Sequence, residues 1–250
     1  MCLIAWNWQP GTAQPLLLLA NRDEFYARPS QAMHWWNGGE VLAGRDLAGG
    51  GTWLGLTRSG RMAALTNYRD PANFRTDAPS RGALVANFLH GALSAEDYLH
   101  SILPSVVDYN GFNLLVFDGA QLMGLESRHA RMLALDAGIG AVSNADFLSP
   151  WPKLEKWRTG LARAVELTPP DQDATYWDLL GDAETAPADQ LPRTGIPLER
   201  ERALSTAFIA TPDYGTRAST LLKIHTGGIS VEERRFEAAG RLGGTSRFKI

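Results

Sequence analysis

The only thiol of the chain occupies a position from which it could do chemistry. Cys2 is the single cysteine among 250 residues, and it follows Met1 directly. Because a small second residue normally permits removal of the initiator methionine, we expect the mature chain to begin at Cys2. One residue would then carry a thiol and a free α-amine with an ordinary pKa of about 8, which can act as the base for that thiol. A buried cysteine with no chemical role is the alternative.

The neighbours of the thiol follow from the first predicted hairpin. Residues 2–8 and 15–20 both have the pattern of strands, and a turn separates them. A hairpin symmetric about Gly11 and Thr12 places Asn21 opposite the N-terminal cysteine. The next three residues along the second strand are also polar: Arg22, Asp23 and Glu24.

An arginine and an aspartate beside a thiol suggest a division of roles. Arg22 would favour the thiolate and so lower the pKa of Cys2. Asp23 can accept a hydrogen bond from the α-ammonium group and hold it in place. We expect Arg22 and Asp23 to form a charge-assisted pair near Cys2. A solvated turn with a local ion pair is the structural alternative.

The composition is that of an ordinary globular protein, with 44% hydrophobic and 20% charged residues and a net charge of −3. The sequence has no basic block, which argues against a nucleic-acid partner. One cysteine cannot form an internal disulfide and fits a reducing compartment. The apolar run at residues 16–20 is too short to span a bilayer. We therefore expect a cytoplasmic protein with no membrane span, folded as one domain over residues 1–250.

The remaining elements alternate between groups of strands and groups of helices. Hydrophobic periodicity predicts a second hairpin, two groups of helices and two later groups of strands. The predicted strands are 52–57, 61–67, 112–117, 121–126, 131–135, 139–144, 219–225 and 229–236. The predicted helical segments are 80–91, 94–103, 152–165 and 176–180. Residues 182–202 are expected to form a surface excursion. The hairpins favour antiparallel sheets. Because several strands are apolar throughout, we expect an α+β fold in which two sheets stack face to face with helices outside.

Five motifs in a fixed order give the chain a family resemblance. They are Asn21-Arg22-Asp23-Glu24 with Phe25-Tyr26-Ala27-Arg28-Pro29 directly after it, Gly50-Gly51-Thr52-Trp53-Leu54-Gly55, Thr66-Asn67-Tyr68-Arg69-Asp70-Pro71, Val142-Ser143-Asn144 and Tyr214-Gly215-Thr216-Arg217. Together they resemble the NRDE family, also called the transport and Golgi organisation protein two family, over essentially the whole chain. That family is similar to the N-terminal-nucleophile (Ntn) hydrolases, whose fold is a four-layer αββα sandwich. The resemblance implies a bile-acid-amidase-like reaction, hydrolysis of a non-peptide C–N bond in a linear amide.

The resemblance also assigns roles to particular residues. It implies that Cys2 is the nucleophile and that Arg22 and Asp23 position the thiol and the α-amine, although the spacing between them differs from that in the amidases. Three later residues match less closely: Asn67 as an oxyanion donor, Asn144 as a positioning group and Arg217 as a late arginine that adds to thiolate stability. Three more are expected to contact substrate: Asn21, Glu24 and Trp53.

A second function class stays open, because a fold can be kept without turnover. The resemblance also connects the family with haem handling, so a non-catalytic protein that binds or carries haem or another apolar small molecule is the alternative. The five histidines show no metal-ligand spacing, and we expect no metal site and no required cofactor. His34, which lies beside Trp35 and Trp36, is the one candidate for a haem contact.

Overall fold

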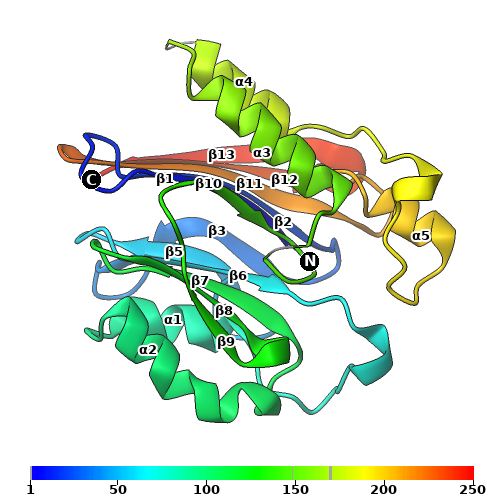
Figure 1. Cartoon of the computed structure of the whole chain (residues 1–250), viewed down its shortest axis with the longest axis horizontal. Coiled ribbons are helices and arrows are strands. Elements are labelled where there is room, and N and C mark those ends of the chain that lie inside the picture. The colour runs from blue at the N-terminus through cyan, green and yellow to red at the C-terminus, as the bar shows by residue number, and fades with distance from the viewer. Residues whose placement is uncertain (1, 148, 169–170) are drawn as a thin grey trace.

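Two antiparallel sheets form the centre of the molecule in a computed structural model that describes residues 2–147, 149–168 and 171–250 (Figure 1). The first sheet has the order β10-β1-β2-β11-β12-β13, and the second runs from β3 to β9 in sequence order. The first contains β1 (Cys2–Trp8), β2 (Leu16–Phe25), β10 (Gly138–Val142), β11 (Tyr214–His225), β12 (Gly228–Glu237) and β13 (Arg241–Lys249). The second contains β3 (Ser30–Trp35), β4 (Val41–Asp46), β5 (Leu54–Thr57), β6 (Met62–Asn67), β7 (Phe112–Phe117), β8 (Leu122–Glu126) and β9 (Arg131–Ala134).

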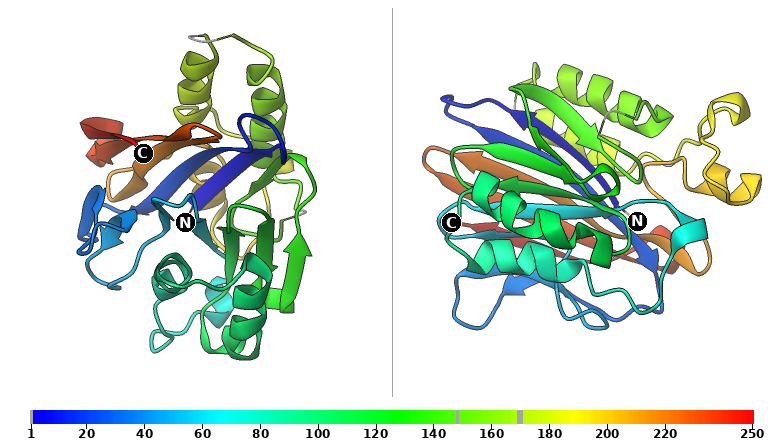
Figure 2. Two further views of the ribbon diagram at one scale, coloured as in Figure 1. Left: turned by 90° about the vertical axis from the view of Figure 1, so that its left-hand side faces the viewer. Right: turned by 60° about the horizontal axis from the view of Figure 1, so that its bottom comes forward.

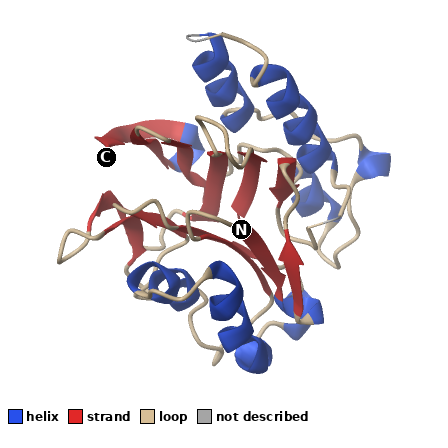
Figure 3. Cartoon of the chain, turned by 60° about the vertical axis from the view of Figure 1, so that its left-hand side comes forward, coloured by secondary structure: helices blue, strands red, loops and turns tan. Residues whose placement is uncertain are grey.

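Helices cover the outer faces of both sheets. The helices are α1 (Gly82–His90), α2 (Ala95–Ile102), α3 (Pro152–Ala164), α4 (Asp171–Leu180) and α5 (Leu198–Ala203). Short 3-10 helices occupy Pro71–Asn73, Leu103–Asp108, Ser127–His129, Ala188–Gln190 and Ala238–Gly240. The views in Figures 1 and 2 place α1 and α2 on the second sheet and α3 and α4 on the first, and in Figure 3 the helices flank the two central layers of strands.

Alternation along each strand divides the apolar residues among three layers of core. On β1, Ile4 and Trp6 point inward and join the core between the sheets, whereas Leu3 points outward and packs with Trp157 of α3. A third core lies between the second sheet and its helices, with Phe88 of α1 at its centre. The expected α+β fold, a four-layer αββα sandwich of two antiparallel sheets, is thereby confirmed.

The first hairpin differs from the expected register by one residue. The amide of Gln9 donates to the carbonyl of Pro15 at 2.8 Å, so the loop is centred on Thr12 and not between Gly11 and Thr12. As a result Cys2 lies opposite Arg22, not Asn21. Because side chains alternate along a strand, this shift places Arg22 on the same inner face as the thiol.

Three strands and one helix were not anticipated from the sequence. The unanticipated strands are β3, β4 and β13. Of these, β13 is mostly exposed and polar. The segment expected to be a surface excursion contains α5 and reaches the cavity described below. Among the described residues, no helix is both long enough and apolar enough to cross a membrane.

Candidate active site

A cavity of about 890 Å³ opens where the ends of the two sheets meet. Its wall comes from the start of β1, the ends of β2 and β6, residues 68–82 after β6, and residues around α5. Six of the residues singled out from the sequence line this one cavity: Cys2, Arg22, Asp23, Glu24, Trp53 and Asn67. Residues that are up to 65 positions apart in the chain are therefore gathered around the thiol, as a reaction site requires.

Cys2 is held at the wall of this cavity through its main chain. It is the first residue of β1, pairs directly with Arg22 on β2, and is only 8% exposed. The hydroxyl of Ser143 donates to its carbonyl oxygen at 3.1 Å. The side chain of Thr66 donates to the carbonyl of Ser143, which ties the second sheet to the same point. Contacts from three strand ends thus fix the main chain of Cys2.

The pKa of the Cys2 thiol runs against the sequence expectation. Burial raises the pKa of this thiol above its ordinary value, and the positive charge of Arg22 offsets only part of that effect. Arg22 thus lowers the pKa as expected, but the net pKa of the thiol is raised because its burial outweighs that effect.

Arg22 has partners other than the one predicted. Its guanidinium lies 4.2 Å from the ring centre of Trp53, and its Nη2 lies 3.4 Å from a carboxylate oxygen of Asp46. Asp23 lies on the other face of β2, where Thr216 donates to its carboxylate at 2.8 Å. The predicted Arg22–Asp23 ion pair does not form, because consecutive strand residues point to opposite faces of the sheet.

Asp23 is deeply buried and strongly held. It is 1% exposed, and burial raises the pKa of its carboxyl group. The phenol of Tyr214 donates to its main-chain carbonyl at 3.0 Å. Glu24, the next residue, also lines the cavity and is within 3.8 Å of Arg28. The two carboxylates are thus neighbours on β2, beside the strand of Cys2, but Asp23 is buried and Glu24 is partly exposed.

Asn67 and Asn144 form a link between the two sheets. The Nδ2 atom of Asn144 donates to the carbonyl of Asn67 at 2.9 Å, and the amide of Arg69 donates to the carbonyl of Asn144 at 2.8 Å. Asn67 lines the cavity, whereas Asn144 is 1% exposed and lies behind it. Asn144 therefore positions the end of β6, and only Asn67 of the pair borders the space that a substrate would occupy.

Two predicted site residues lie elsewhere. The side-chain amide of Asn21 donates to the carbonyls of Leu180 and Ala207 on the helix-covered face of the first sheet. Arg217 donates through one nitrogen to three main-chain carbonyls, those of Phe25, Tyr26 and Arg28. Neither residue lines the cavity of Cys2, and Arg217 borders a different cavity between the sheets.

Two buried charged residues near the site, Arg69 and Lys153, were not predicted as site residues from the sequence. Arg69, which lines the cavity, forms an ion pair of 2.6 Å with Glu201 of α5, and both side chains are almost fully buried. Lys153 of α3 donates to the carbonyl of Leu204 at 3.1 Å, and burial lowers its pKa to about 8. Arg69 stood within a quoted motif and could have been found there. Lys153 lies in an ordinary amphipathic helix that carries no such signal.

The cavity wall carries more arginines than carboxylates. The arginines are Arg22, Arg28, Arg69, Arg75, Arg81 and Arg200, and the carboxylates are Asp23, Glu24, Asp46 and Asp70. Such an excess of positive charge attracts a ligand that bears an acidic group. His34, the haem candidate, lies on β3 with its Nδ1 atom 2.8 Å from the carbonyl of Ala32, and it lines neither this cavity nor the one near Arg217.

Comparison with known proteins identifies the family. The chain matches the model of a family described as Transport and Golgi organisation 2 over residues 1–238. It is 36% identical to the Transport and Golgi organization protein 2 homolog of Bos taurus, across 94% of this chain and 92% of that protein. The chain belongs to the Transport and Golgi organisation 2 family. The Homo sapiens homolog of the family is 33% identical over the same shares of the two chains. The family predicted from the five motifs is thereby confirmed.

Solved structures of similar arrangement include two hydrolases. One is the C2A mutant of conjugated bile acid hydrolase from Clostridium perfringens, with a TM-score of 0.48 and 10% identity over 99% of this chain and 92% of that chain. The other is the Caenorhabditis elegans ortholog of N-acylethanolamine-hydrolyzing acid amidase, with a TM-score of 0.42 and 11% identity over 88% and 92%. Likeness at this level says nothing about the chemistry of this chain.

Proposed function

We propose that this member of the Transport and Golgi organisation 2 family hydrolyses a linear amide at a non-peptide C–N bond, with Cys2 as its N-terminal nucleophile. The observation that carries the proposal is that Cys2, the second residue of the chain, lines the 890 Å³ cavity together with Arg22 and Asn67. A thiol with no chemical role would not need a place on the wall of a large cavity that charged side chains also line.

The reaction follows from the groups at that wall once Met1 has been removed. The α-amine of Cys2 takes the proton of the thiol, so the raised thiol pKa is overcome by a base on the same residue. The sulfur attacks the amide carbon, and the carbonyl oxygen becomes an oxyanion. The C–N bond then breaks, and the amine leaves with the proton that the α-ammonium returns. Water hydrolyses the thioester, releases the acid and restores the thiol.

Other cavity residues have supporting roles in this proposal. Asn67, or a backbone N–H beside it, donates to the oxyanion, as such donors do in acyl transfer. The carboxylate of Asp23 holds the α-ammonium, and the excess of arginines on the wall favours a substrate with an acidic group. Trp53 and Glu24 border the substrate, and Asn144 keeps Asn67 in place.

The experiment compares the wild type with Cys2→Ser, which keeps the shape of the residue but weakens the nucleophile. Both are incubated with N-acyl amides in matched pairs, one member neutral and one bearing a carboxylate. We expect turnover by the wild type, faster for the acidic member, and a loss of at least about a hundredfold in Cys2→Ser. Equal turnover by both proteins would rule out Cys2 as the nucleophile.

The non-catalytic alternative remains a proposal that the same pair of proteins tests. A carrier of haem or of another apolar molecule would hold its ligand through the cavity wall and need no nucleophile. Titration of both proteins with haem, followed by absorbance, therefore accompanies the amide assay. Tight haem binding by the wild type with no turnover of any amide would favour the carrier over the hydrolase.

A further inference from the structure

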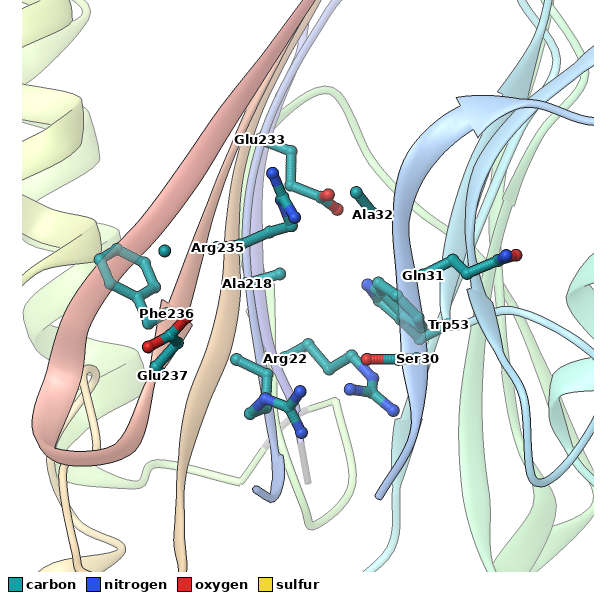
Figure 4. A pocket seen from close by; sticks show the side chains of 12 residues that line it. Arg22, Ser30, Gln31, Ala32, Trp53, Ala218, Glu233, Arg235, Phe236 and Glu237 are labelled. Atoms are coloured by element: carbon teal, nitrogen blue, oxygen red, sulfur yellow. The ribbon is translucent and has the colours of Figure 1, made fainter. Parts of the chain in front are cut away.

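A second cavity of about 170 Å³ lies between the two sheets (Figure 4). Arg22 and Trp53 line both cavities. The other lining residues come from β3 on one wall and from β11, β12 and β13 on the facing wall. In Figure 4 the side chain of Arg22 extends toward Ser30 and Trp53 on the facing wall, whereas the guanidinium of Arg235 turns toward Glu233, whose carboxylate extends toward Ala32.

The sheet register explains why two arginines face this space. Across the first sheet, Arg22 pairs with Ala218, and Ala218 pairs with Arg235. Residues paired in this way share a face of the sheet, so both guanidinium groups project inward with only the small Ala218 between them. Gly244 is the next residue of the row, and a Cβ atom there would lie 2.4 Å from Nη2 of Arg235. The absence of a side chain at Gly244 thus leaves room for Arg235.

Three polar atoms at this cavity have no hydrogen-bond partner among the described residues: Nη1 of Arg22, Nε of Arg235 and Oε2 of Glu233. Arg22 is 5% and Glu233 is 1% exposed. The other carboxylate oxygen of Glu233 accepts the amide of Met33 at 2.8 Å, which fixes the side chain between the sheets. Buried polar atoms without partners are costly, and their clustering at one cavity indicates a polar occupant.

The positions of these atoms describe that occupant. The donor of Arg235 matches a carboxylate, and the oxygen of Glu233 matches a donor group such as an ammonium or a hydroxyl. Burial raises the pKa of Glu233, so a ligand that supplies a positive charge or a hydrogen-bond donor would stabilise its ionised form. The volume of about 170 Å³ limits the ligand to a few heavy atoms beyond its carboxylate.

We propose that this cavity is a binding site for a small α-substituted carboxylic acid, an α-amino or α-hydroxy acid, which places its carboxylate against Arg235 and its amino or hydroxyl group against Glu233. The site is separate from the thiol chemistry of Cys2 and does not depend on it.

The test uses three probes of nearly equal size: L-alanine, L-lactate and propionate. Binding to the complete wild-type chain is measured by titration calorimetry at constant ionic strength, up to about 10 mM ligand. We expect saturable binding of L-alanine or L-lactate, and binding at least about tenfold weaker for propionate, which lacks the donor for Glu233. The stronger of the first two probes tells the amino acid from the hydroxy acid.

Matched variants on one strand locate the site. Glu233→Gln and Arg235→Gln should each weaken binding of the preferred probe by about tenfold or more. Glu232→Gln and Arg234→Gln alter the same two residue types on the opposite face of β12, where Arg234 covers Trp177, and should leave binding unchanged. Thermal melting confirms that each variant is folded.

The proposal is overturned by any of three results. They are no saturable binding of L-alanine or L-lactate, equal binding of propionate, or equal binding by the inner-face and outer-face variants. None of these results bears on amide hydrolysis by Cys2, which is measured separately.

Discussion

Cys2 is a buried thiol whose neighbours only partly offset the cost of charging it. Arg22 stands directly opposite on β2 and stacks on Trp53, yet burial still raises the pKa of the thiol. In the hydrolase that we propose, the missing activation comes from the α-amine. The reactivity of the thiol should therefore depend on whether a residue precedes Cys2, more than on the charges around it.

We predict that iodoacetamide distinguishes two forms of the chain at pH 7. A form with an extension before Cys2 should react no faster than a free-cysteine peptide, since its thiol is 8% exposed and its pKa is raised. A form that begins at Cys2 should react faster, because the amine takes the proton. Labelling followed by intact mass gives both rates, and equal rates would contradict a role for the amine.

Lys153 gives the stability of the protein a distinct dependence on pH. Its pKa is lowered by burial to about 8, whereas in the unfolded chain it keeps the ordinary value of about 10.4. Between these values the unfolded chain holds a proton that the folded chain has lost, so the free energy of unfolding rises with pH, by up to about 1.4 kcal/mol per pH unit. Below about pH 8 the cost of burying the charge is fully present.

We predict that Lys153→Met removes this rise. Urea unfolding between about pH 8 and pH 10 should show the wild type gaining stability relative to the variant as the pH increases. Lys156→Met is the matched control, since Lys156 lies one turn away, is partly exposed and pairs with Asp182. Parallel curves for the wild type and Lys153→Met would show that the lysine does not titrate in this window.

At the scale of elements, residues at the ends of strands position the candidate active site. The turn after β10 carries Ser143 and Asn144, which bond to β1 and to the end of β6. Two strands on different sheets are thereby fixed next to each other. Such links between sheets are not visible in a sequence, because they depend on how the two sheets are stacked.

We predict that Asn144→Ala lowers stability by about 1–3 kcal/mol, because the carbonyl of Asn67 loses its buried donor. Turnover should fall further than stability alone explains, since the end of β6 is then free to shift. Asn73→Ala, which removes an exposed contact with Asp70, is the control. Chemical unfolding and the amide assay are compared for the two variants, and indistinguishable results would mean that Asn144 has no positioning role.

Hydrophobic alternation predicted the elements that have a clear apolar face. Strands β1, β5 to β8 and β12 and helices α1 to α3 follow from it, as does the stacking of two sheets. Strand β13 carries an exposed, largely polar sequence and gave no such signal. The one-residue shift of the first hairpin arose because the loop closes through Gln9 and Pro15, a detail that composition does not encode. That shift explains why Arg22, and not Asn21, faces the thiol.

At the scale of the whole molecule, α5 and the residues on either side of it close one side of the main cavity. Ile196, Arg200 and Leu204 line that cavity, and Glu201 anchors the segment through its pair with Arg69. Both partners are nearly fully buried, so their attraction must offset a large desolvation cost. The segment expected to be a surface excursion is therefore part of the site wall.

We predict that Glu201→Gln lowers the free energy of unfolding by about 3–5 kcal/mol, because it leaves the buried charge of Arg69 without this carboxylate. The double variant Arg69→Met/Glu201→Leu should recover much of that loss. Glu155→Gln breaks an exposed pair with Arg158 and should change stability by less than about 1 kcal/mol. Denaturant unfolding of the three variants tests this, and a cost for Glu201→Gln as small as that for Glu155→Gln would contradict it.

The most direct measurement for the central claim is a search for the acyl-thioester on Cys2. A chain that begins at Cys2 is mixed with an N-acyl amide that it turns over, quenched in acid within the first turnover, and weighed intact. The account predicts a mass gain equal to the acyl group, located on Cys2 by peptide mapping, removed by hydroxylamine, and missing from the chain that carries an extension before Cys2. Turnover with no adduct on Cys2, or the same adduct on the extended chain, would contradict it.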